Sequence, residues 1–275
     1  VNGKGEIIKS GGTVVKNVTG YDLSKLVTGS FGTLVALTEI TFKVLPLKQS
    51  SGTLAIHDLS NKEMVELFSK IAGSSNEISG SAFLPLEPKN KKFQENRKDV
   101  FKFNDLKFED NYLAIRMEGS KKSIDERKNN LFKELDLKNK KLSELDFYQS
   151  VPFWQKINNL ELFNNSENSI IRIVIPPSKC LDLINFFDDD YKYFIDWCGS
   201  LIWAEVCDMS DDKLSTIRNF IVEIGGYLTV IKQPKNQLLN EIFTFNDSRL
   251  YISKKIKESF DPKGILNPGK MYIGV

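Results

Sequence analysis

The sequence has 275 residues, of which 41% are hydrophobic and 27% are charged, and its formal net charge is only +2. This composition is that of a globular protein with a sizeable core, and it excludes a disordered tail, a coiled coil and a fibrous repeat. Balanced charge argues against a nucleic-acid-binding domain, and no apolar run is long enough to span a membrane.

Cysteine and histidine are scarce in this sequence. Three cysteines without a CxxC spacing are too few for a disulfide framework or an iron–sulfur cluster. The single histidine, His57, excludes a histidine-rich metal site within the chain, so we expect no metal. Free cysteines are typical of a reducing compartment, and we therefore expect a cytoplasmic protein.

The first 47 residues are rich in glycine and β-branched residues. Residues 1–17 read as a strand, a Gly-Gly turn and a second strand. The stretch 21–27 predicts a short helix with Asp22 or Ser24 near its start. Alternating apolar residues then predict a long strand over 33–45. Together these features predict a small β-rich region with one short helix.

From residue 52 onward the pattern predicts alternating strands and amphipathic helices. The order β-α-β-β-α-β occurs twice, over 52–146 and 169–232, and each repeat is typical of a ferredoxin-like split βαβ unit. Capping-box spacings predict that helices begin at Ser60 and at Ser123. The remaining elements are strands at 52–59, 78–85, 111–119, 141–146, 169–176, 191–197, 200–206 and 227–233, helices over 178–188, 214–224 and 247–259, and a polar surface loop over 87–109.

Two glycine-containing segments could carry chemistry. Glycines in 16–34 allow left-handed turns whose backbone N–H groups can hold a phosphate or a ring carbonyl. The tail motif Asn-Pro-Gly-Lys at 267–270 would present Asn267 rigidly. The alternative is that both segments only make turns.

These segments also carry a resemblance. Residues 16–46 and the tail FDPKGILNPGKMY resemble the FAD-linked oxidase superfamily of the vanillyl-alcohol-oxidase, or PCMH, type. Within it, GGTVVKNVTGYDLSKL, ISGSAF, AIRMEGS, PFWQKI, FIDWCGSLIW and NPGKMY are similar to the family of FAD-binding E subunits of bacterial glycolate oxidases.

The resemblance implies an α+β fold in three parts. Residues 1–50 would be the C-terminal part of a PCMH-type FAD-binding domain. Residues 51–245 would form the cap domain, an antiparallel sheet with helices, and 246–275 would return to the flavin domain. The implied cofactor-binding residues are Lys16, Asn17, Gly20, Tyr21, Gly29, Ser30, Gly32, Thr33, Leu34 and Asn267.

The resemblance also implies a function without naming a catalytic residue. We expect an FAD-binding subunit of a glycolate, or 2-hydroxy acid, oxidase complex that carries electrons or supports a catalytic flavoprotein subunit beside an iron–sulfur subunit. Any membrane association would be peripheral, at the inner face of the cell membrane and through these partners. One alternative is a self-sufficient FAD-linked 2-hydroxy-acid dehydrogenase, which the single histidine argues against. The other is a flavin-free structural subunit, which is favoured by Val35 at a position where the family has glycine.

The sequence begins with Val1 inside a hairpin-like pattern, so we expect a C-terminal fragment of a longer protein. The pyrophosphate-binding loop would then lie upstream. We expect weak FAD binding by the chain itself and an exposed apolar face in residues 1–47.

Two arginines in the predicted cap are candidates for a substrate carboxylate. Arg116 and Arg172 each lie in an otherwise apolar strand, where a guanidinium can clamp a carboxylate with two hydrogen bonds. The alternative is an internal ion pair, and Glu118 is the evident partner for Arg116.

Overall fold

A computed structural model describes the chain except for short gaps. The described residues are 1–14, 20–86, 93, 100–101, 110–234, 242–244 and 247–271. The chain divides into two compact units. We call Val1–Pro46 with Asn240–Val275 the terminal unit and Leu47–Leu239 the sheet unit.

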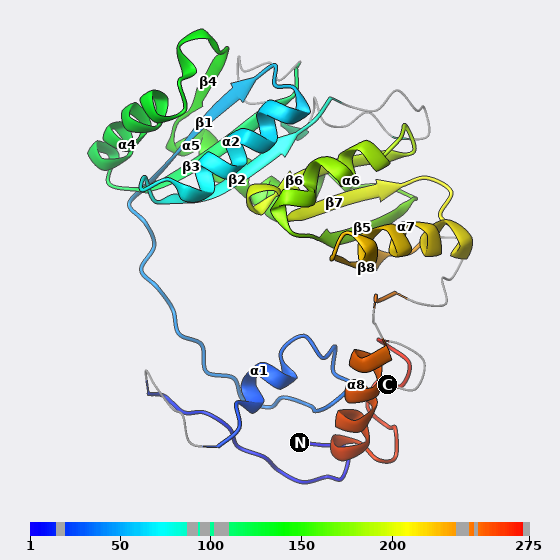
Figure 1. Ribbon diagram of the computed structural model, residues 1–275. Helices are drawn as coiled ribbons and strands as arrows, with labels where there is room; N and C mark the ends of the chain where they lie inside the picture. Colours follow the sequence, from blue (N-terminus) through cyan, green and yellow to red (C-terminus); the bar gives the residue numbers. More distant parts are fainter. Residues whose placement is uncertain are drawn as a thin grey trace. The chain divides into compact units, whose positions relative to one another are not determined.

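The sheet unit contains eight strands and the helices that cover them (Figure 1). The strands are β1 (Ser50–His57), β2 (Ile78–Leu84), β3 (Tyr112–Gly119), β4 (Leu142–Leu145), β5 (Ser169–Val174), β6 (Tyr191–Asp196), β7 (Leu201–Val206) and β8 (Tyr227–Lys232). The helices are α2 (Asn61–Gly73), α4 (Lys121–Glu134), α5 (Phe147–Asn158), α6 (Cys180–Phe186) and α7 (Asp211–Glu223), with short 3-10 turns η1 (Leu137–Asn139), η2 (Glu161–Phe163), η3 (Pro177–Lys179) and η4 (Trp197–Gly199).

The strands form one antiparallel sheet in the order β4-β1-β3-β2-β6-β7-β5-β8. Each half has the βαββαβ order of elements and places its strands as 4-1-3-2, which confirms the prediction of two ferredoxin-like split βαβ units. The halves join where β2 pairs with β6, through Ala82 opposite Asp196 and Phe83 opposite Ile195.

Helix starts in the sheet unit follow from local capping. Ser60 and Glu63 form the predicted capping box at the start of α2. The predicted start at Ser123 is wrong, because Ser120 caps α4 and accepts a hydrogen bond from the Ser123 N–H at 3.3 Å. Helix α5 was not predicted, although Asp146 and Gln149 form a capping box there. Its interior Pro152 and aromatic residues obscure the helical pattern.

Residues of β1 alternate between the two faces of the sheet. Thr53 and Ala55 face α5, where the Trp154 indole donates a 2.9 Å hydrogen bond to the Thr53 hydroxyl. Gly52 lies on the other face, and a Cβ there would press on Ile124 of α4. Both faces of the first half are therefore covered by helices, and the core lies on each side of the strands.

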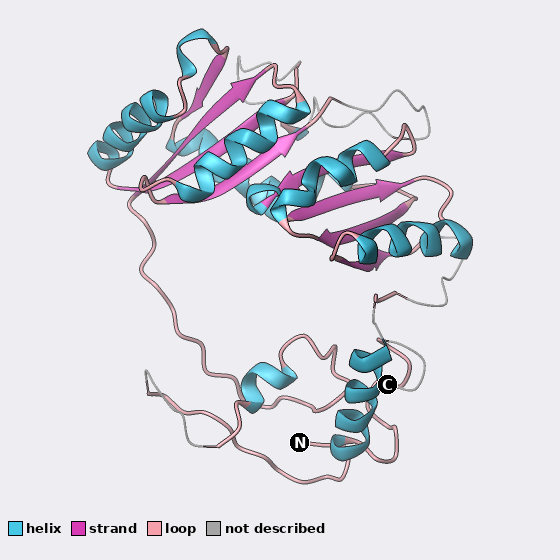
Figure 2. Cartoon of the chain, viewed as in Figure 1, coloured by secondary structure: helices cyan, strands magenta, loops and turns pink. Residues whose placement is uncertain are grey.

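The terminal unit has little regular structure among its described residues (Figure 2). It contains α1 (Leu23–Val27), α8 (Asp247–Phe260) and one bridge between Asn2 and Val35. The predicted cap of α1 is confirmed, since Asp22 accepts from the Lys25 N–H. The hairpin over 1–17 is wrong for the part that the structure describes, and the strand over 33–45 is wrong. A strand needs a neighbour to pair with, and beyond the bridge none is present among the described residues.

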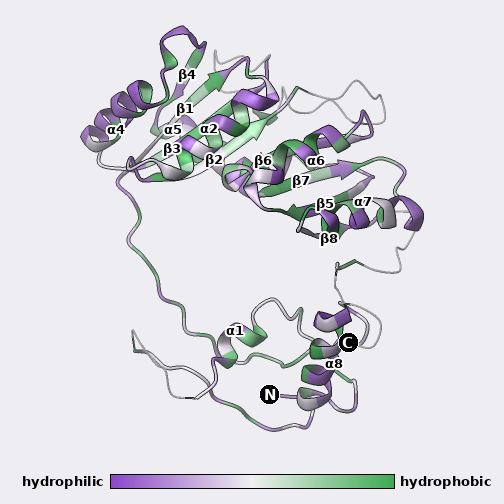
Figure 3. Cartoon of the chain, in the orientation of Figure 1, coloured by the Kyte–Doolittle hydropathy of each residue, from purple (hydrophilic) through white to green (hydrophobic). Residues whose placement is uncertain are grey.

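Instead, the segment after Val35 carries exposed apolar side chains. Ile40, Phe42 and Val44 are 55%, 76% and 83% exposed, and hydropathy colouring marks this stretch with several apolar positions (Figure 3). The exposed apolar face expected in residues 1–47 is therefore observed. In the described part of the chain, no helix combines the length and hydropathy needed to cross a bilayer.

Candidate functional site

The candidate site is a loop at residues 28–36 of the terminal unit. Gly29, Phe31 and Gly32 have left-handed backbone conformations, with φ of 79°, 52° and 72°. Between and after them, Ser30 and Thr33 are buried, and the backbone N–H and the hydroxyl of Thr33 both donate to the Ser30 carbonyl. Glycine makes this sharp path accessible, and the buried hydroxyl residues hold it closed.

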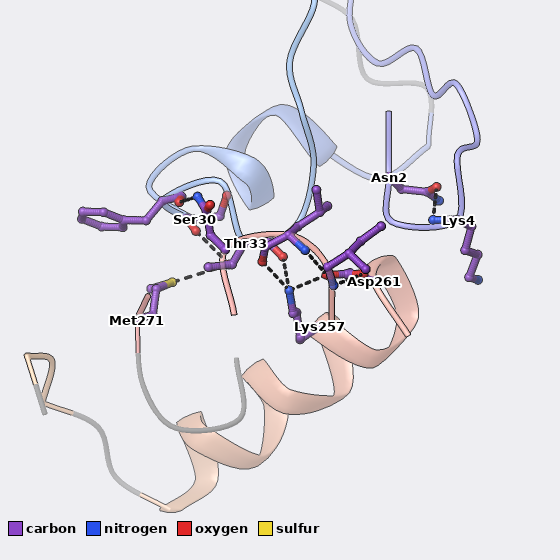
Figure 4. Close-up of polar contacts among 11 residues, drawn as sticks. Asn2, Lys4, Ser30, Thr33, Lys257, Asp261 and Met271 are labelled. Carbon is purple, nitrogen blue, oxygen red and sulfur yellow. Dashed lines mark hydrogen bonds and ion pairs between the residues drawn. The ribbon is translucent and has the colours of Figure 1, made fainter. Parts of the chain in front are cut away.

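A buried lysine from α8 holds this loop (Figure 4). The Lys257 ammonium donates to the Thr33 carbonyl at 2.8 Å and to the Leu266 carbonyl at 2.7 Å, and it pairs with the Asp261 carboxylate at 2.6 Å. Lys257 is 5% exposed and Asp261 is 2% exposed. One charged group thus connects the loop to the tail that follows α8.

Asp261 organises that tail. Its carboxylate accepts from the backbone N–H groups of Ile265 at 3.1 Å and Leu266 at 2.7 Å. Burial raises the pKa of Asp261, but the hydrogen bonds from Lys257 and these two N–H groups outweigh it, and the net pKa is lowered. Gly3 packs so closely against Asp261 that a Cβ would collide with the carboxylate. Three separate segments therefore meet at one ion pair.

The predicted tail residue Asn267 does lie at the loop. Its side-chain amide donates to the Phe31 carbonyl at 2.8 Å, and its own φ is 42°. A Cβ at Gly32 would lie 2.8 Å from the Asn267 amide nitrogen. Gly32 is therefore required both by its conformation and by the close approach of Asn267.

The loop fits a ligand with hydrogen-bond acceptors. Among the described residues, none accepts a hydrogen bond from the backbone N–H of Gly29, Phe31 or Gly32. All three residues are exposed, and nothing lies within 4 Å of a Cβ built on Gly29. Adjacent left-handed residues with unpaired N–H groups form the kind of concavity that binds phosphate or carbonyl oxygens. These residues fit the polar oxygens of a flavin nucleotide.

The other predicted cofactor residues are distributed differently. Lys16 and Asn17 lie outside the described residues. Gly20 and Tyr21 precede α1, and the Tyr21 side chain is 93% exposed. Leu34 belongs to the loop and is buried at 6% exposure. The structure brings Gly29, Ser30, Gly32, Thr33 and Leu34 together with Asn267 in one unit, whereas Gly20 and Tyr21 stand on the other side of α1 in the sequence.

The two predicted substrate arginines lie in the sheet unit. Arg116 of β3 pairs with Glu118 at 2.5 Å and also donates to the Ser51 hydroxyl at 3.4 Å. Arg172 of β5 lies over the rings of Trp197 and Trp203. The internal-acid alternative is therefore observed for Arg116 only.

The single histidine lies in the sheet core. His57 ends β1, is 1% exposed and has its Nε2 atom 2.9 Å from the Ser143 hydroxyl. It is a buried strand histidine. Within the described ranges, no group of three or more His, Cys, Asp or Glu residues could hold a metal ion.

Sequence reasoning missed Lys257 and Asp261. The signal was present, because the two residues stand four apart at the end of the last helix, immediately before Pro262. At that spacing a lysine and an aspartate share one helix face. Their burial followed from contacts with distant segments, which spacing alone does not reveal.

Comparisons with known proteins find similarity to FAD-linked oxidases and glycolate oxidase subunits. Residues 242–271, which contain α8 and the tail, match the family described as FAD linked oxidases, C-terminal domain. Along 99% of its length the chain is 28% identical to the glycolate oxidase subunit GlcE of Escherichia coli, and along 98% it is 22% identical to the glycolate oxidase subunit GlcD of Bacillus subtilis. The chain spans 63% of GlcE and 61% of GlcD.

A solved structure shares the fold. An alkyldihydroxyacetonephosphate synthase matches 92% of the chain and 50% of its own, with a TM-score of 0.55 and 16% identity. The matched C-terminal segment and the chain-long similarity to glycolate oxidase subunits confirm the resemblance to FAD-linked oxidases, and the solved structure shows a shared fold.

Proposed function

We propose that the protein is an FAD-binding subunit of an enzyme complex that oxidises glycolate or a related 2-hydroxy acid. The observation that carries the proposal is the loop of Gly29, Phe31 and Gly32, whose backbone N–H groups have no acceptor among the described residues. Lys257, which lies in the family-matched segment, holds this loop through the Thr33 carbonyl. A flavin, when bound, supplies the capacity to accept electrons and pass them on.

In this proposal the chain's own residues bind and orient the flavin. The N–H groups of Gly29, Phe31 and Gly32 would donate to flavin oxygens, and Asn267 would be fixed beside them by its hydrogen bond to Phe31. Lys16, Asn17, Gly20 and Tyr21 remain proposed cofactor contacts by resemblance. The exposed apolar segment around Phe42 would be covered by a part of the protein that binds the pyrophosphate.

The proposed partners are a catalytic flavoprotein subunit and an iron–sulfur subunit. Similarity to both GlcE and GlcD, each named as a glycolate oxidase subunit, supports a place in such a complex. The buried, strand-bound position of His57 supports an electron-carrying or supporting role over independent oxidation, because no exposed histidine is available as a base.

The first test is flavin retention. The 275-residue chain and a version with any residues that precede it in its gene, here called the full-length product, are each incubated with FAD and desalted, and their visible absorption is recorded. We expect a flavin spectrum in the full-length product. A colourless full-length product would overturn the FAD-binding role and favour the flavin-free alternative, and glycolate turnover by the isolated product would instead favour a self-sufficient dehydrogenase.

Paired glycine variants locate the site. Gly29→Ala and Gly5→Ala impose the same kind of strain, since φ is 79° and 84° and nothing lies within 4 Å of either added Cβ. Only Gly29 belongs to the candidate loop. We expect Gly29→Ala to lose flavin and Gly5→Ala to keep it, and equal retention by both variants would contradict the loop assignment.

The departure from the family glycine is tested separately. Val35 is partly buried and forms the bridge to Asn2 near the end of the candidate loop. If Val35 restricts the approach of the flavin, Val35→Gly raises the fraction of flavin retained after desalting. Unchanged retention would show that the valine is accommodated.

A further inference from the structure

Arg172 of the sheet unit has no hydrogen-bond or ion-pair partner among the residues that the structure describes. Its recorded contacts are with two indole rings. Its Cζ atom lies 5.6 Å from the centre of the Trp197 ring and 5.9 Å from that of Trp203. Stacking of this kind orients a guanidinium while leaving its N–H donors available.

Strand register determines the sheet face on which Arg172 lies. Ile171 and Ile173, its neighbours in β5, are completely buried on the opposite face. Arg172 stands opposite Trp203 of β7 and opposite Thr229 of β8. Arg172 and Trp203 are only partly buried, and Trp197 is 57% exposed. All three side chains are therefore partly accessible to solvent within this unit.

The turn that holds Trp197 is strained. Trp197, Cys198 and Gly199 have φ of 50°, 50° and 91°, so two successive residues with side chains are left-handed. The turn is fixed by Asp196, which accepts from the Trp197 N–H at 2.7 Å, and by Ser81, whose hydroxyl accepts from the Cys198 N–H at 3.0 Å. Strain of this kind persists where surrounding contacts impose it, and it is common at ligand clamps.

Arg116 provides an internal comparison. The register through Ala114, Ala82 and Asp196 places it on the same sheet face as Arg172. It also lies over an indole, with its Cζ 5.9 Å from the Trp154 ring centre. Unlike Arg172, it is satisfied by the carboxylate of Glu118 at 2.5 Å. At Arg172 the corresponding carboxylate is missing from the described residues.

We propose that Arg172, with Trp197 and Trp203, binds the carboxylate of a small organic acid. The guanidinium presents paired N–H donors that match two carboxylate oxygens, and the two indoles fix the plane of the guanidinium. Phosphate offers the same pair of oxygens, and the choice of a carboxylate rests on the proposed function, because 2-hydroxy acids and their 2-oxo products carry that group. No chemical step is assigned to this site.

The test is to titrate small anions into the whole chain without added flavin. Binding is monitored by tryptophan fluorescence and by the NMR signals of the indole N–H groups. Glycolate, acetate and inorganic phosphate are compared with sodium chloride at equal ionic strength. We expect glycolate and acetate to give saturable changes in the Trp197 and Trp203 signals. The signal of buried Trp154 should not move, and Trp197→Phe assigns the signals.

Two variants and a control decide the outcome. We expect Arg172→Gln to weaken carboxylate binding about tenfold or more, and Arg172→Lys, which keeps the charge without the paired donors, to weaken it less. Arg116→Gln is the matched control and should leave the titration unchanged. Retained NMR dispersion verifies that each variant folds.

Several results would overturn the inference. These are a response no larger than that of sodium chloride, equal binding by Arg172→Gln and the unchanged chain, or saturation by phosphate alone. A lost flavin spectrum with an intact titration would refute the proposed function and leave the carboxylate site standing. A retained flavin spectrum without a saturable titration would refute only the carboxylate site and leave the proposed function standing.

Discussion

Replacing Lys257 with methionine should release the candidate loop from the tail. The ammonium of Lys257 has three partners, the carbonyls of Thr33 and Leu266 and the carboxylate of Asp261. Methionine has a similar length but donates no hydrogen bond. The substitution would therefore leave a buried carboxylate without its counter-charge and two carbonyls without a donor.

The expected cost is large for a unit of this size. Removing one member of a buried ion pair typically costs about 3–5 kcal/mol, because the remaining charge stays buried. Whole domains are usually stable by only about 5–15 kcal/mol. The backbone N–H groups of Ile265 and Leu266 still solvate Asp261 and hold the cost toward the lower end. We expect the terminal unit to lose about 3 kcal/mol.

Hydrogen–deuterium exchange followed by mass spectrometry measures this loss locally. A loss of about 3 kcal/mol corresponds to exchange more than about a hundredfold faster for backbone amides of the loop 28–36 and the turn 261–267. Peptides from β3 and β7 should exchange at an unchanged rate, because they belong to the sheet unit.

Lys255 offers a matched control on the same helix. It pairs with Glu258 at 2.9 Å, but the two side chains are 57% and 63% exposed. Such surface pairs contribute at most about 1 kcal/mol, so Lys255→Met should change exchange in the loop only slightly. Equal effects of Lys255→Met and Lys257→Met, or unchanged exchange in Lys257→Met, would refute the claim that the buried pair joins loop and tail.

Three further predictions follow from charge and conformation. Burial raises the pKa of Asp196 to about 6, so the folded state binds the proton more tightly and stability falls as pH rises from about 4 through 6. Asp196→Asn, which keeps the acceptor for the Trp197 N–H, should therefore be more stable than the unchanged chain at pH 7, by on the order of 2 kcal/mol in denaturant titrations, with no gain near pH 4. The pKa of Asp261 is lowered in the folded protein. The stabilisation that the ionised carboxylate provides is therefore complete above the ordinary pKa of 3.8 and is lost as the pH falls through the folded pKa. Hydrogen exchange in the turn 261–267 should rise as the pH falls through the folded pKa in the unchanged chain, and it should not rise in Asp261→Asn. Gly32→Ala should destabilise the loop by about 1–2 kcal/mol because the position has a left-handed φ, and it should also displace the Asn267 amide. Gly264→Ala is the control, because its φ is 62° and nothing lies near the added Cβ, so only the conformational strain of the backbone is introduced. Hydrogen exchange rates in the loop would reveal the difference between the two variants.

Local signals in the sequence were sufficient to predict the strands and most of the helices of the sheet unit. Strands and helices follow one another closely along the chain in this unit. The capping box at Ser60 and the apolar stripe of α2 each depend only on residues that are near neighbours in the sequence. Helix α5 was missed because Pro152 and its aromatic residues interrupt that pattern. The sheet order could be inferred from two repeats of a known unit, but the β2–β6 junction could not, because nothing local selects which edges join.

The terminal unit was predicted poorly for a physical reason. Its apolar alternation over 33–45 is a real strand signal, but a strand forms only against a neighbour, and the described residues supply one bridge. The glycine loop and Asn267 were found from their residue types and the family resemblance. Lys257 was not, because its role depends on the Thr33 carbonyl, which is 224 residues away in the chain.

The junction between the two halves of the sheet has a consequence for how the protein can be divided. Only two residue pairs, centred on Ala82 and Phe83, connect β2 to β6. A half produced alone would present its inner strand as an open edge, a template on which other copies add and aggregate. In the intact chain β2 and β6 pair with each other, so neither is an open edge. One edge strand of the whole sheet is β4, which is only 4 residues long. Pairing of the two halves therefore guards each against self-association, and a half produced alone would need charged residues on the open edge of β2 or β6 to stay monomeric.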